Sequence, residues 1–282
     1  MSMPMAASSI SLRPMTAADL PACHALSVTV GWAHRLADWR WMQGLGRGVV
    51  AEADGAIVGT TLWWLYGEAA SSLGMVIVRP DRQGLGIGRR LVEAALAAIG
   101  DRSMGLIATD EGAPLYARLG FAVTGKVLQQ QGTARAADPP RSGLRPVRPN
   151  DIDALVALDQ AAKGVPRPAA IAALADVGDG VALTEGERIT GFAFCREAGL
   201  GRVIGPVAAP DTDGARALIG HWLARHAGTV LRVDTPAESG IGEWLAAHGL
   251  ALAGTRTAMT RGALPGASGP ARSFGLINQG LG

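Results

Sequence analysis

The sequence repeats itself over a long period, and this repeat constrains the fold more than any other feature. The segment from Leu12 to Leu26 aligns without gaps on the segment from Leu144 to Leu158, with seven identical residues in fifteen positions. Two further pairs of segments match in the same order: Ala53–Trp63 with Thr184–Phe194, and Leu115–Gly125 with Trp244–Gly254. Because each repeat is already as long as a domain, the pattern predicts two copies of one domain rather than a solenoid.

A segment rich in proline, alanine and glycine separates the two copies. It runs from Gln131 to Gly143 and is typical of a linker. We therefore expect one domain over residues 1–135 and a second over residues 136–282. Of the 282 residues, 48% are hydrophobic, which is enough to bury two cores.

Hydrophobic periodicity in the first copy predicts an α/β domain with a mixed sheet flanked by helices. The expected strands are Ile10–Arg13, Gly48–Ala53, Ile57–Leu65, Leu73–Val78, Gly105–Ala108 and Phe121–Leu128. The expected helices begin at about Ala17, with Thr16 as cap, and cover His34–Met42, Gly86–Ile99 and Gly112–Leu119. Within the third helix, Leu91, Ala95 and Ile99 recur at helical spacing and should face the sheet.

Charge and cysteine content exclude several classes of function. The net charge of +2 comes from scattered arginines rather than a basic run, so a nucleic-acid partner is not expected. The cysteines, Cys23 and Cys195, are too far apart in sequence to suggest a metal cluster or a disulfide framework. Residues 1–14 contain no charged leader followed by an apolar run. We expect a cytoplasmic protein with a small-molecule partner, no metal and no membrane partner.

The stretch QGLGIG, from Gln83 to Gly88, follows an apolar strand and enters a helix. Its alternate glycines leave the backbone amides open to a ligand, because no Cβ blocks approach. The first turn of the helix and the following Arg89 add positive potential. The expected ligand therefore carries a pyrophosphate. A Walker loop would need a following Lys-Ser or Lys-Thr, and a dinucleotide fingerprint would need G-x-G-x-x-G, so both fit poorly.

The ordered set of motifs resembles the GNAT superfamily of acyl-coenzyme A dependent N-acyltransferases. QGLGIG is similar to the family motif Q/R-x-x-G-x-G/A, VIVRP (Val76–Pro80) precedes it as in the family, and LYARLGF (Leu115–Phe121) follows it. The resemblance covers about residues 10 to 130 well and the second half weakly. It implies two tandem GNAT-like domains, and transfer of acetyl from acetyl-coenzyme A to a primary amine of a small molecule or amino acid.

The resemblance also implies which residues bind the coenzyme. Backbone groups of Val76, Ile77 and Val78 would bind the pantetheine arm, and a strand N–H near Val76 or Ile77 could stabilise the oxyanion. The pyrophosphate would be held by Gln83, Gly84, Leu85, Gly86, Ile87, Gly88 and Arg89. Thr109 stands where the family often has an asparagine near the arm. Tyr116 takes the place of the proton donor to sulfur, since a phenol of pKa about 10 stays protonated at neutral pH.

The general base and the acceptor pocket stay open at this stage. Many family members carry a glutamate where this chain has Ser72. Glu68, in the turn before that strand, is the first candidate, although a solvated hairpin charge is the alternative. The other candidates are Asp110, Glu111, Asp38 and His34, the last two also being spaced as an exposed helix ion pair. Trp32, Trp39 and Glu111 are expected at the acceptor pocket, with core packing as the alternative for the tryptophans.

The second copy lacks this chemistry. When Gly205 is aligned on Gly74, acidic Asp211 and Asp213 fall where phosphate would bind, and Leu245 takes the tyrosine position. We expect a degenerate domain without coenzyme, which completes the acceptor pocket, stabilises the first domain or mediates a homodimer. Two rival functions are a coenzyme-binding sensor without catalysis and a nicotinamide-dependent dehydrogenase, the latter disfavoured by the loop spacing.

Overall fold

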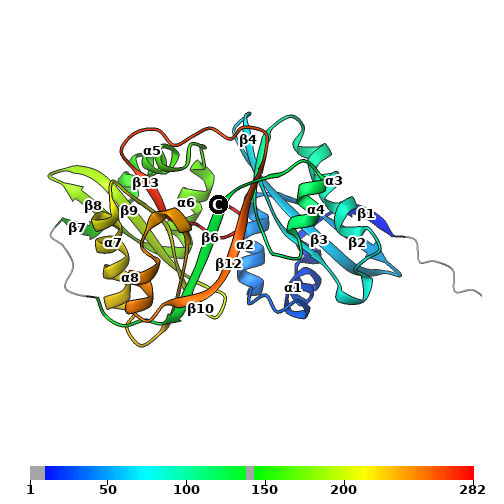
Figure 1. Cartoon of the computed structure of the whole chain (residues 1–282), viewed down its shortest axis with the longest axis horizontal. Coiled ribbons are helices and arrows are strands. Elements are labelled where there is room, and N and C mark those ends of the chain that lie inside the picture. The colour runs from blue at the N-terminus through cyan, green and yellow to red at the C-terminus, as the bar shows by residue number, and fades with distance from the viewer. Residues whose placement is uncertain (1–9, 138–142) are drawn as a thin grey trace, which may run out of the picture. The chain divides into compact units, whose positions relative to one another are not determined.

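The computed structural model describes residues 10–137 and 143–282 and shows the same order of α-helices and strands twice, with one more strand at the end of the second copy (Figure 1). The first copy contains β1 (Ser11–Pro14), the 3-10 turn η1 (Ala17–Asp19), α1 (Leu20–Thr29), α2 (Leu36–Leu45), β2 (Arg47–Ala53), β3 (Ala56–Tyr66), β4 (Ala70–Val78), η2 (Pro80–Arg82), α3 (Ile87–Ile99), β5 (Ser103–Ala108), α4 (Ala113–Arg118) and β6 (Ala122–Thr133). The second contains β7 (Leu144–Pro146), η3 (Pro149–Asp151), α5 (Ile152–Lys163), α6 (Pro168–Val177), β8 (Gly178–Glu185), β9 (Arg188–Ala198), β10 (Gly201–Ala209), α7 (Thr212–Arg225), β11 (Val230–Pro236), η4 (Ala237–Ser239), α8 (Gly242–Ala247), β12 (Ala251–Arg261) and β13 (Arg272–Gly275). The predicted mixed α/β fold is confirmed.

Identical residues of the repeat make the same contact in both copies. In the first copy Arg13 donates two hydrogen bonds of 2.8 Å to Asp19, whose carboxylate also accepts from the Thr16 backbone. In the second copy Arg145 donates bonds of 2.6 and 2.9 Å to Asp151. The shared Arg and Asp therefore tie the first strand of each copy to the start of its first helix. This contact explains why those positions of the repeat match.

The predicted elements differ from the observed ones at a few boundaries. The helix expected from Ala17 begins as a 3-10 turn and becomes α-helical at Leu20. The linker expected from Gln131 begins later, because β6 continues to Thr133 and pairs there with β11. Residues 138–142 of the predicted linker lie outside the described residues. The boundary between residues 135 and 136 stays a prediction.

The chain divides into two compact units that do not follow the order of the sequence. Among the described residues, the first unit holds 10–64 and 73–100, and its strands lie in the order β1, β2, β3, β4. Helix α3 packs on this sheet through Ile87, Leu91, Val92, Ala95 and Ile99, all buried. The apolar stripe predicted for this helix is thus confirmed.

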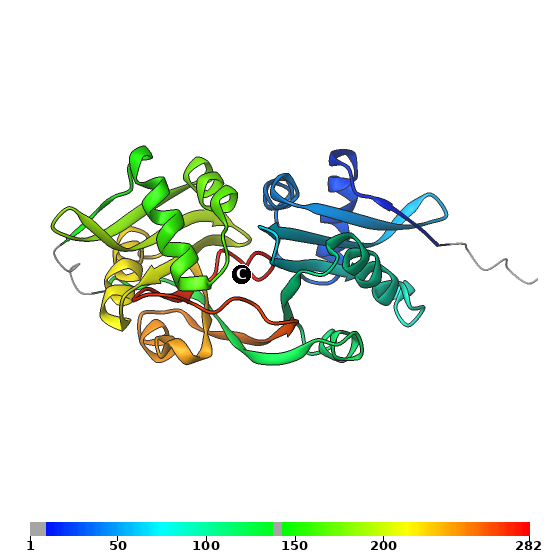
Figure 2. The ribbon, with the colours of Figure 1, turned by 90° about the horizontal axis from the view of Figure 1, so that it is seen from above.

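The second unit holds residues 65–72, 101–137 and 143–282, with its strands in the order β5, β12, β6, β11, β10, β9, β8, β7. In this sheet the last strands of the two copies have changed places. Strand β12 of the second copy lies between β5 and β6 of the first, and β6 lies between β11 and β12 of the second. Figures 1 and 2 show β6 and β12 side by side. Elements of both copies therefore share one sheet.

Candidate active site

The glycine loop between β4 and α3 is shaped by its backbone. Gly84 and Gly86 have φ angles of 76° and 75°, in the left-handed region that favours glycine. A Cβ built at either residue would meet no atom within 4 Å. Within the protein, both glycines are thus needed for their conformation rather than to avoid a clash, and residues 83–86 of the loop are exposed.

The amides of this loop have no protein acceptor. Backbone hydrogen bonds of the preceding turn end with Gln83 N to Pro80 O, and those of the helix resume with Arg90 N to Gly86 O. Between them, the amides from Gly84 to Arg89 find no acceptor among the described residues. Such a row at a helix N-terminus fits a diphosphate. The positive charge expected from Arg89 is partly neutralised, because Arg89 donates a 2.7 Å bond to the carboxylate of Glu93.

Strand β4, which leads into the loop, contains a conformation that the sequence did not predict. Met75 has a φ of 54°, which is unusual for a residue with a side chain, and it is buried. Its carbonyl accepts a 2.8 Å bond from the Thr60 hydroxyl on β3. Outliers of this kind cluster at functional sites. The outlier directly precedes Val76, Ile77 and Val78, the residues expected to bind the pantetheine arm.

Tyr116 lies on α4 in the second unit. Its side chain is 8% exposed and packs edge to face on Phe121, with ring centroids 5.8 Å apart. Burial raises the pKa of Tyr116 above the usual value for a phenol. Its hydroxyl forms no hydrogen bond with the part of the chain that the structure describes. Tyr116 is therefore a protonated phenol whose proton is not committed to a protein acceptor.

The turn from β5 into α4 holds Thr109 and Glu111. The Thr109 hydroxyl accepts a 3.2 Å bond from Gly112 N, so it shapes the start of α4. Glu111 is exposed, and its pKa lies below the usual range because its own backbone N–H and the Thr109 hydroxyl bond its carboxylate, with a smaller effect of Arg256. A carboxylate with a lowered pKa is a weaker base.

The other base candidates have different surroundings. Glu68 is exposed in the turn between β3 and β4, and Asp110 is exposed after β5. Asp38 is buried and bonded to Arg35 at 2.9 Å through the backbone N–H. His34 precedes α2, and its carbonyl faces His24 Nε2 at 3.0 Å, so it does not share a helix face with Asp38 as its spacing suggested.

Ser72, which stands where the family often has glutamate, is buried. Its hydroxyl lies 2.8 Å from that of Tyr66, which also donates a 2.7 Å bond to Leu281 O. Burial raises the pKa of Tyr66 to about 12. Both hydroxyls therefore take part in a buried hydrogen-bond network of the second unit. The identity of the general base stays a prediction.

The two candidate acceptor tryptophans are not equally accessible. Trp39 is fully buried, and its indole N–H donates a 3.2 Å bond to the Ser27 hydroxyl of α1. This contact favours the core-packing alternative for Trp39. Trp32, between α1 and α2, is half-buried and lies edge to face on His34 with centroids 5.8 Å apart. Trp32 is therefore the better placed of the two to touch an acceptor.

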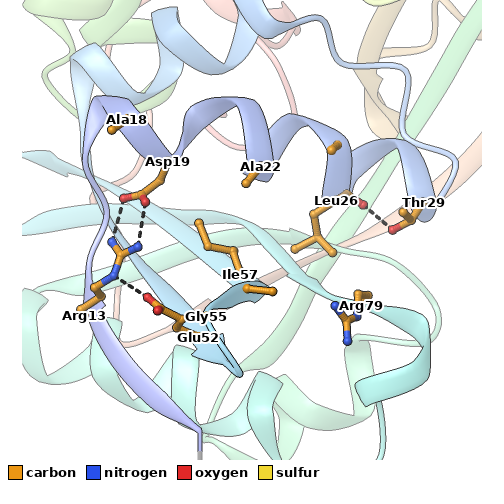
Figure 3. A pocket seen from close by; sticks show the side chains of 12 residues that line it. Arg13, Ala18, Asp19, Ala22, Leu26, Thr29, Glu52, Gly55, Ile57 and Arg79 are labelled. Atoms are coloured by element: carbon orange, nitrogen blue, oxygen red, sulfur yellow. Dashed lines mark hydrogen bonds and ion pairs between the residues drawn. The ribbon is translucent and has the colours of Figure 1, made fainter.

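A pocket of about 450 Å³ in the first unit contains none of the predicted site residues (Figure 3). Its walls are mostly small or apolar side chains of α1 and of the turn between β2 and β3. Its arginines are paired, Arg13 with Asp19 and Glu52 and Arg79 with Asp81. A rim with balanced charge does not favour a phosphate. The unpaired amides of the glycine loop are the better anion site.

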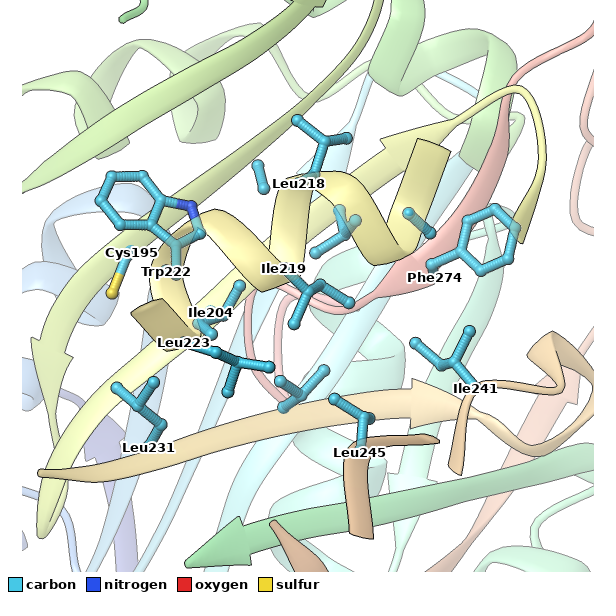
Figure 4. Packing of buried hydrophobic residues seen from close by; sticks show 14 of the residues in the cluster. Cys195, Ile204, Leu218, Ile219, Trp222, Leu223, Leu231, Ile241, Leu245 and Phe274 are labelled. Atoms are coloured by element: carbon cyan, nitrogen blue, oxygen red, sulfur yellow. The ribbon is translucent and has the colours of Figure 1, made fainter. Parts of the chain in front are cut away.

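The second copy differs from the first at each corresponding place. Residues 210–211 alone connect β10 to α7, so no loop of the first kind exists there. The Asp211 side chain accepts a 2.7 Å bond from Gly214 N and thus occupies the helix N-terminus with its own carboxylate. Leu245, at the position of Tyr116, is fully buried in the core formed by α7, α8 and the sheet (Figure 4).

Strand β13 fills the gap between two strands of the second copy. β10 and β11 pair in parallel at Arg202 with Leu231 and at Val203 with Arg232, near the start of both strands. Further along, β13 pairs with β10 instead, from Val207 to Ala209. Leu276 N then donates a 2.9 Å bond to Asp234 O of β11. A coenzyme arm between β10 and β11 would have to displace this segment.

Comparison with known proteins agrees with this geometry. Two family models, each described as an acetyltransferase (GNAT) domain, match residues 155–270 and 44–123. An uncharacterized N-acetyltransferase of Bacillus subtilis, YitH, is 30% identical over 193 residues, which cover 66% of this chain and 67% of YitH. No helix among the described residues is long and apolar enough to cross a membrane.

Solved structures show the same fold. A putative acetyltransferase from Pyrococcus horikoshii superposes with a TM-score of 0.82 at 15% identity, covering 100% of this chain and 99% of that one. A tandem GNAT protein from the clavulanic acid biosynthesis pathway gives a TM-score of 0.60 at 13% identity, covering 89% and 98%. The chain therefore belongs to the GNAT family of acetyltransferases and is an acyltransferase built from two GNAT domains.

Proposed function

We propose that the chain transfers the acetyl group of acetyl-coenzyme A to the primary amine of a small molecule or amino acid, and that the first copy alone binds the coenzyme. The observation that carries the proposal is the row of unpaired amides from Gly84 to Arg89 at the start of α3. The α3 dipole adds to their attraction for a diphosphate. When bound, the coenzyme supplies an acetyl group activated as a thioester.

Different residues of this chain would then bind the coenzyme, donate a proton to the leaving thiolate and accept the proton of the amine. Backbone amides of the glycine loop bind the diphosphate, and the backbone of Val76–Val78 binds the pantetheine arm next to the outlier at Met75. Tyr116 holds a proton on a hydroxyl that no described residue accepts from, so it can donate that proton to a leaving thiolate. Glu68 remains the first candidate to take the proton of the amine, through a water, because it is exposed in the turn that leads into β4.

The features of the second copy favour a stoichiometry of one coenzyme per chain, bound by the first copy. Asp211 occupies the N-terminus of α7, Leu245 has no proton to give, and β13 fills the gap between β10 and β11. Titration calorimetry with acetyl-coenzyme A should therefore give a stoichiometry close to one. A stoichiometry of two would contradict the assignment of the second copy.

The loop assignment is tested by two glycines of the same backbone conformation. Gly86 and Gly240 have φ angles of 75° and 72° with ψ angles of 4° and 9°, and a Cβ at either meets nothing within 4 Å. Gly86→Ala and Gly240→Ala therefore cost a similar backbone strain of about 1–2 kcal/mol. Only Gly86→Ala should weaken the binding of acetyl-coenzyme A in calorimetry, because only Gly86 shapes the amide row. Equal affinities of the two variants would overturn the assignment.

An assay of free thiol released from acetyl-coenzyme A, run with a set of primary amines, distinguishes catalysis from binding alone. An acetyltransferase releases the coenzyme thiol with at least one acceptor, whereas the sensor alternative binds the coenzyme without turnover. Absence of binding heat would contradict both. NADH titration followed by fluorescence should show no binding, since the loop is not a dinucleotide fingerprint.

A further inference from the structure

Strand exchange brings an arginine of the second copy to the end of a strand of the first. Thr257 of β12 pairs with Ala108, the last residue of β5. The preceding residue, Arg256, therefore lies where the chain turns from β5 into α4, the helix that carries Tyr116. Its charge contributes to the lowered pKa of Glu111 in this turn, after the bonds from the Glu111 backbone and Thr109.

The guanidinium of Arg256 lies against the backbone of its own strand, β12. One nitrogen, Nη1, donates a 3.0 Å bond to Thr255 O. A Cβ at Gly254 would lie 3.0 Å from the same nitrogen, so the missing side chain makes room for the guanidinium. Gly254 pairs with Gln129 and Arg256 with Val127 on β6, which places all four residues on one face of the sheet.

A network of polar side chains covers the same face. We call it the polar floor, and it consists of Gln129, Gln131, Arg232, Asp234, Arg256 and Gln279. Gln129 donates a 3.4 Å bond to Gln131, and Gln279 donates to Gln129 at 3.4 Å and to Asp234 at 3.2 Å. Arg232 donates bonds of 2.7 to 3.1 Å to Asp234. These bonds hold the other side chains of the polar floor to one another, whereas Arg256, among the described residues, bonds only to its own strand.

No carboxylate of the polar floor pairs with Arg256, and its charge acts on Glu111 only through a weak electrostatic effect without an ion pair. Arg232 and Asp234 form an ion pair at 2.7 Å and neutralise each other. No carboxylate of the described residues lies within the 4.0 Å of an ion pair from Arg256, which is half-buried. A half-buried guanidinium that spends one nitrogen on a carbonyl retains donors for an external anion. Carboxylate is the anion whose geometry a guanidinium matches best, through two parallel bonds.

We propose that Arg256 binds a carboxylate on the acceptor, so that the acceptor is an amine of the amino-acid type rather than a simple amine. This inference rests on the proposed acetyl transfer and narrows its acceptor. It also gives the second copy a part in the reaction of the first, because β12 carries Arg256 to the end of β5. Arg256 acts as a specificity residue, and the Thr255 carbonyl and the space at Gly254 position it.

The experiment compares acceptors that differ in the carboxylate alone. Each amino acid of a standard set is assayed with its amide and with its decarboxylated amine, and thiol release gives kcat and KM. The wild type should prefer the carboxylate form. Arg256→Ala should raise KM for that form about tenfold to hundredfold, the usual loss for bonds to a charged group, with little change in kcat and no change in KM for the amides.

Three further variants separate recognition from a structural effect. Arg256→Lys keeps the charge and should restore part of the affinity. Gly254→Ala keeps the arginine but crowds its Nη1, and should raise KM for carboxylates to a smaller degree. Arg261→Ala is the matched control, because Arg261 is exposed on the same strand and pairs with the buried Met104, which places it on the opposite face. It should leave the preference unchanged.

The failure of this inference differs from the failure of the proposed function. If amines release thiol but the wild type uses amides as well as carboxylates, or if Arg256→Ala raises KM equally for both, the carboxylate site is wrong and acetyl transfer stands. If acetyl-coenzyme A neither binds nor reacts with any amine, the proposed function and this inference fall together. Calorimetry with acetyl-coenzyme A on Arg256→Ala should give the wild-type affinity, which shows that the variant is folded.

Discussion

Removal of the Tyr116 hydroxyl should separate chemistry from stability. The ring is 8% exposed and packs on Phe121, whereas the hydroxyl forms no hydrogen bond with the described residues. Tyr116→Phe keeps the packing and breaks no protein hydrogen bond, so the free energy of unfolding should change by less than about 1 kcal/mol. The assay is urea unfolding of the variant and the wild type.

The expected effect on the rate is far larger. A positioned proton donor contributes about 10²-fold to 10⁴-fold to the rate. This factor corresponds to about 3–5 kcal/mol of activation free energy. In a thiol-release assay, kcat of Tyr116→Phe should fall by this factor, while the affinity for acetyl-coenzyme A stays unchanged. Because burial raises the pKa of Tyr116, the wild type should not lose its donor below about pH 10.

The second tyrosine of the chain is the matched control, because its hydroxyl has the opposite surroundings. Tyr66 donates to Leu281 O at 2.7 Å and lies 2.8 Å from the Ser72 hydroxyl, and all three residues are buried. Tyr66→Phe should therefore lower the free energy of unfolding by about 1–3 kcal/mol. A wild-type kcat in Tyr116→Phe would refute the proton-donor role, and a large loss of stability in that variant would refute the claim that its hydroxyl is unbonded.

Two predictions concern stability alone. The side chains of Asp159 and Arg167 form an ion pair and are 2% and 1% exposed. Asp159→Asn should lower the free energy of unfolding, measured in urea, by about 3–5 kcal/mol, because it leaves the buried charge of Arg167 without its carboxylate. Arg188→Ala breaks an exposed pair instead and should cost less than about 1 kcal/mol, so similar losses would contradict the argument. Bonds from arginine hold the pKa values of Asp19 and Asp151 below the usual range. Their contribution is therefore present above about pH 4 and lost as pH falls further, and urea titrations from pH 6 to pH 3 on Asp→Asn variants should show a flatter pH dependence.

Local sequence signals predicted the elements and the glycine loop. The apolar spacing of Leu91, Ala95 and Ile99 needs no tertiary information, since it follows from one helix lying on one sheet. Gly84 and Gly86 were recognisable because no other residue adopts a positive φ as readily. Such features depend on neighbours within one or two turns of the chain.

The features that the sequence did not predict depend on distant contacts. The positive φ of Met75 is held by Thr60 on another strand, and methionine gives no hint of it. The position of β13 beside β10 depends on the pairing of Val207 with Gly275, far along the chain. The same holds for Trp39, whose burial depends on packing against α1 and includes a bond to Ser27.

Strand exchange was invisible in the sequence for a different reason. Strands β6 and β12 hold equivalent positions in the order of the two copies, and both begin in matching segments of the repeat, so their sequences do not tell which copy each will join. Pairing partners are set by the register and by the surrounding sheet rather than by composition. The exchange has a physical consequence for the second copy. Without β12, β5 and β6 would each expose an unpaired edge, and exposed edges promote aggregation.

Under the proposed function, the second copy could lose its chemistry but not its fold. The short connection at residues 210–211, Leu245 at the position of Tyr116 and β13 beside β10 all leave β12 in place between β5 and β6. Each of these differences would remove a feature that we propose for coenzyme binding, and none touches the strand that completes the sheet of the first copy. Since that strand also carries Arg256, retention of the second copy follows both from the integrity of the sheet and from the recognition of an acceptor carboxylate.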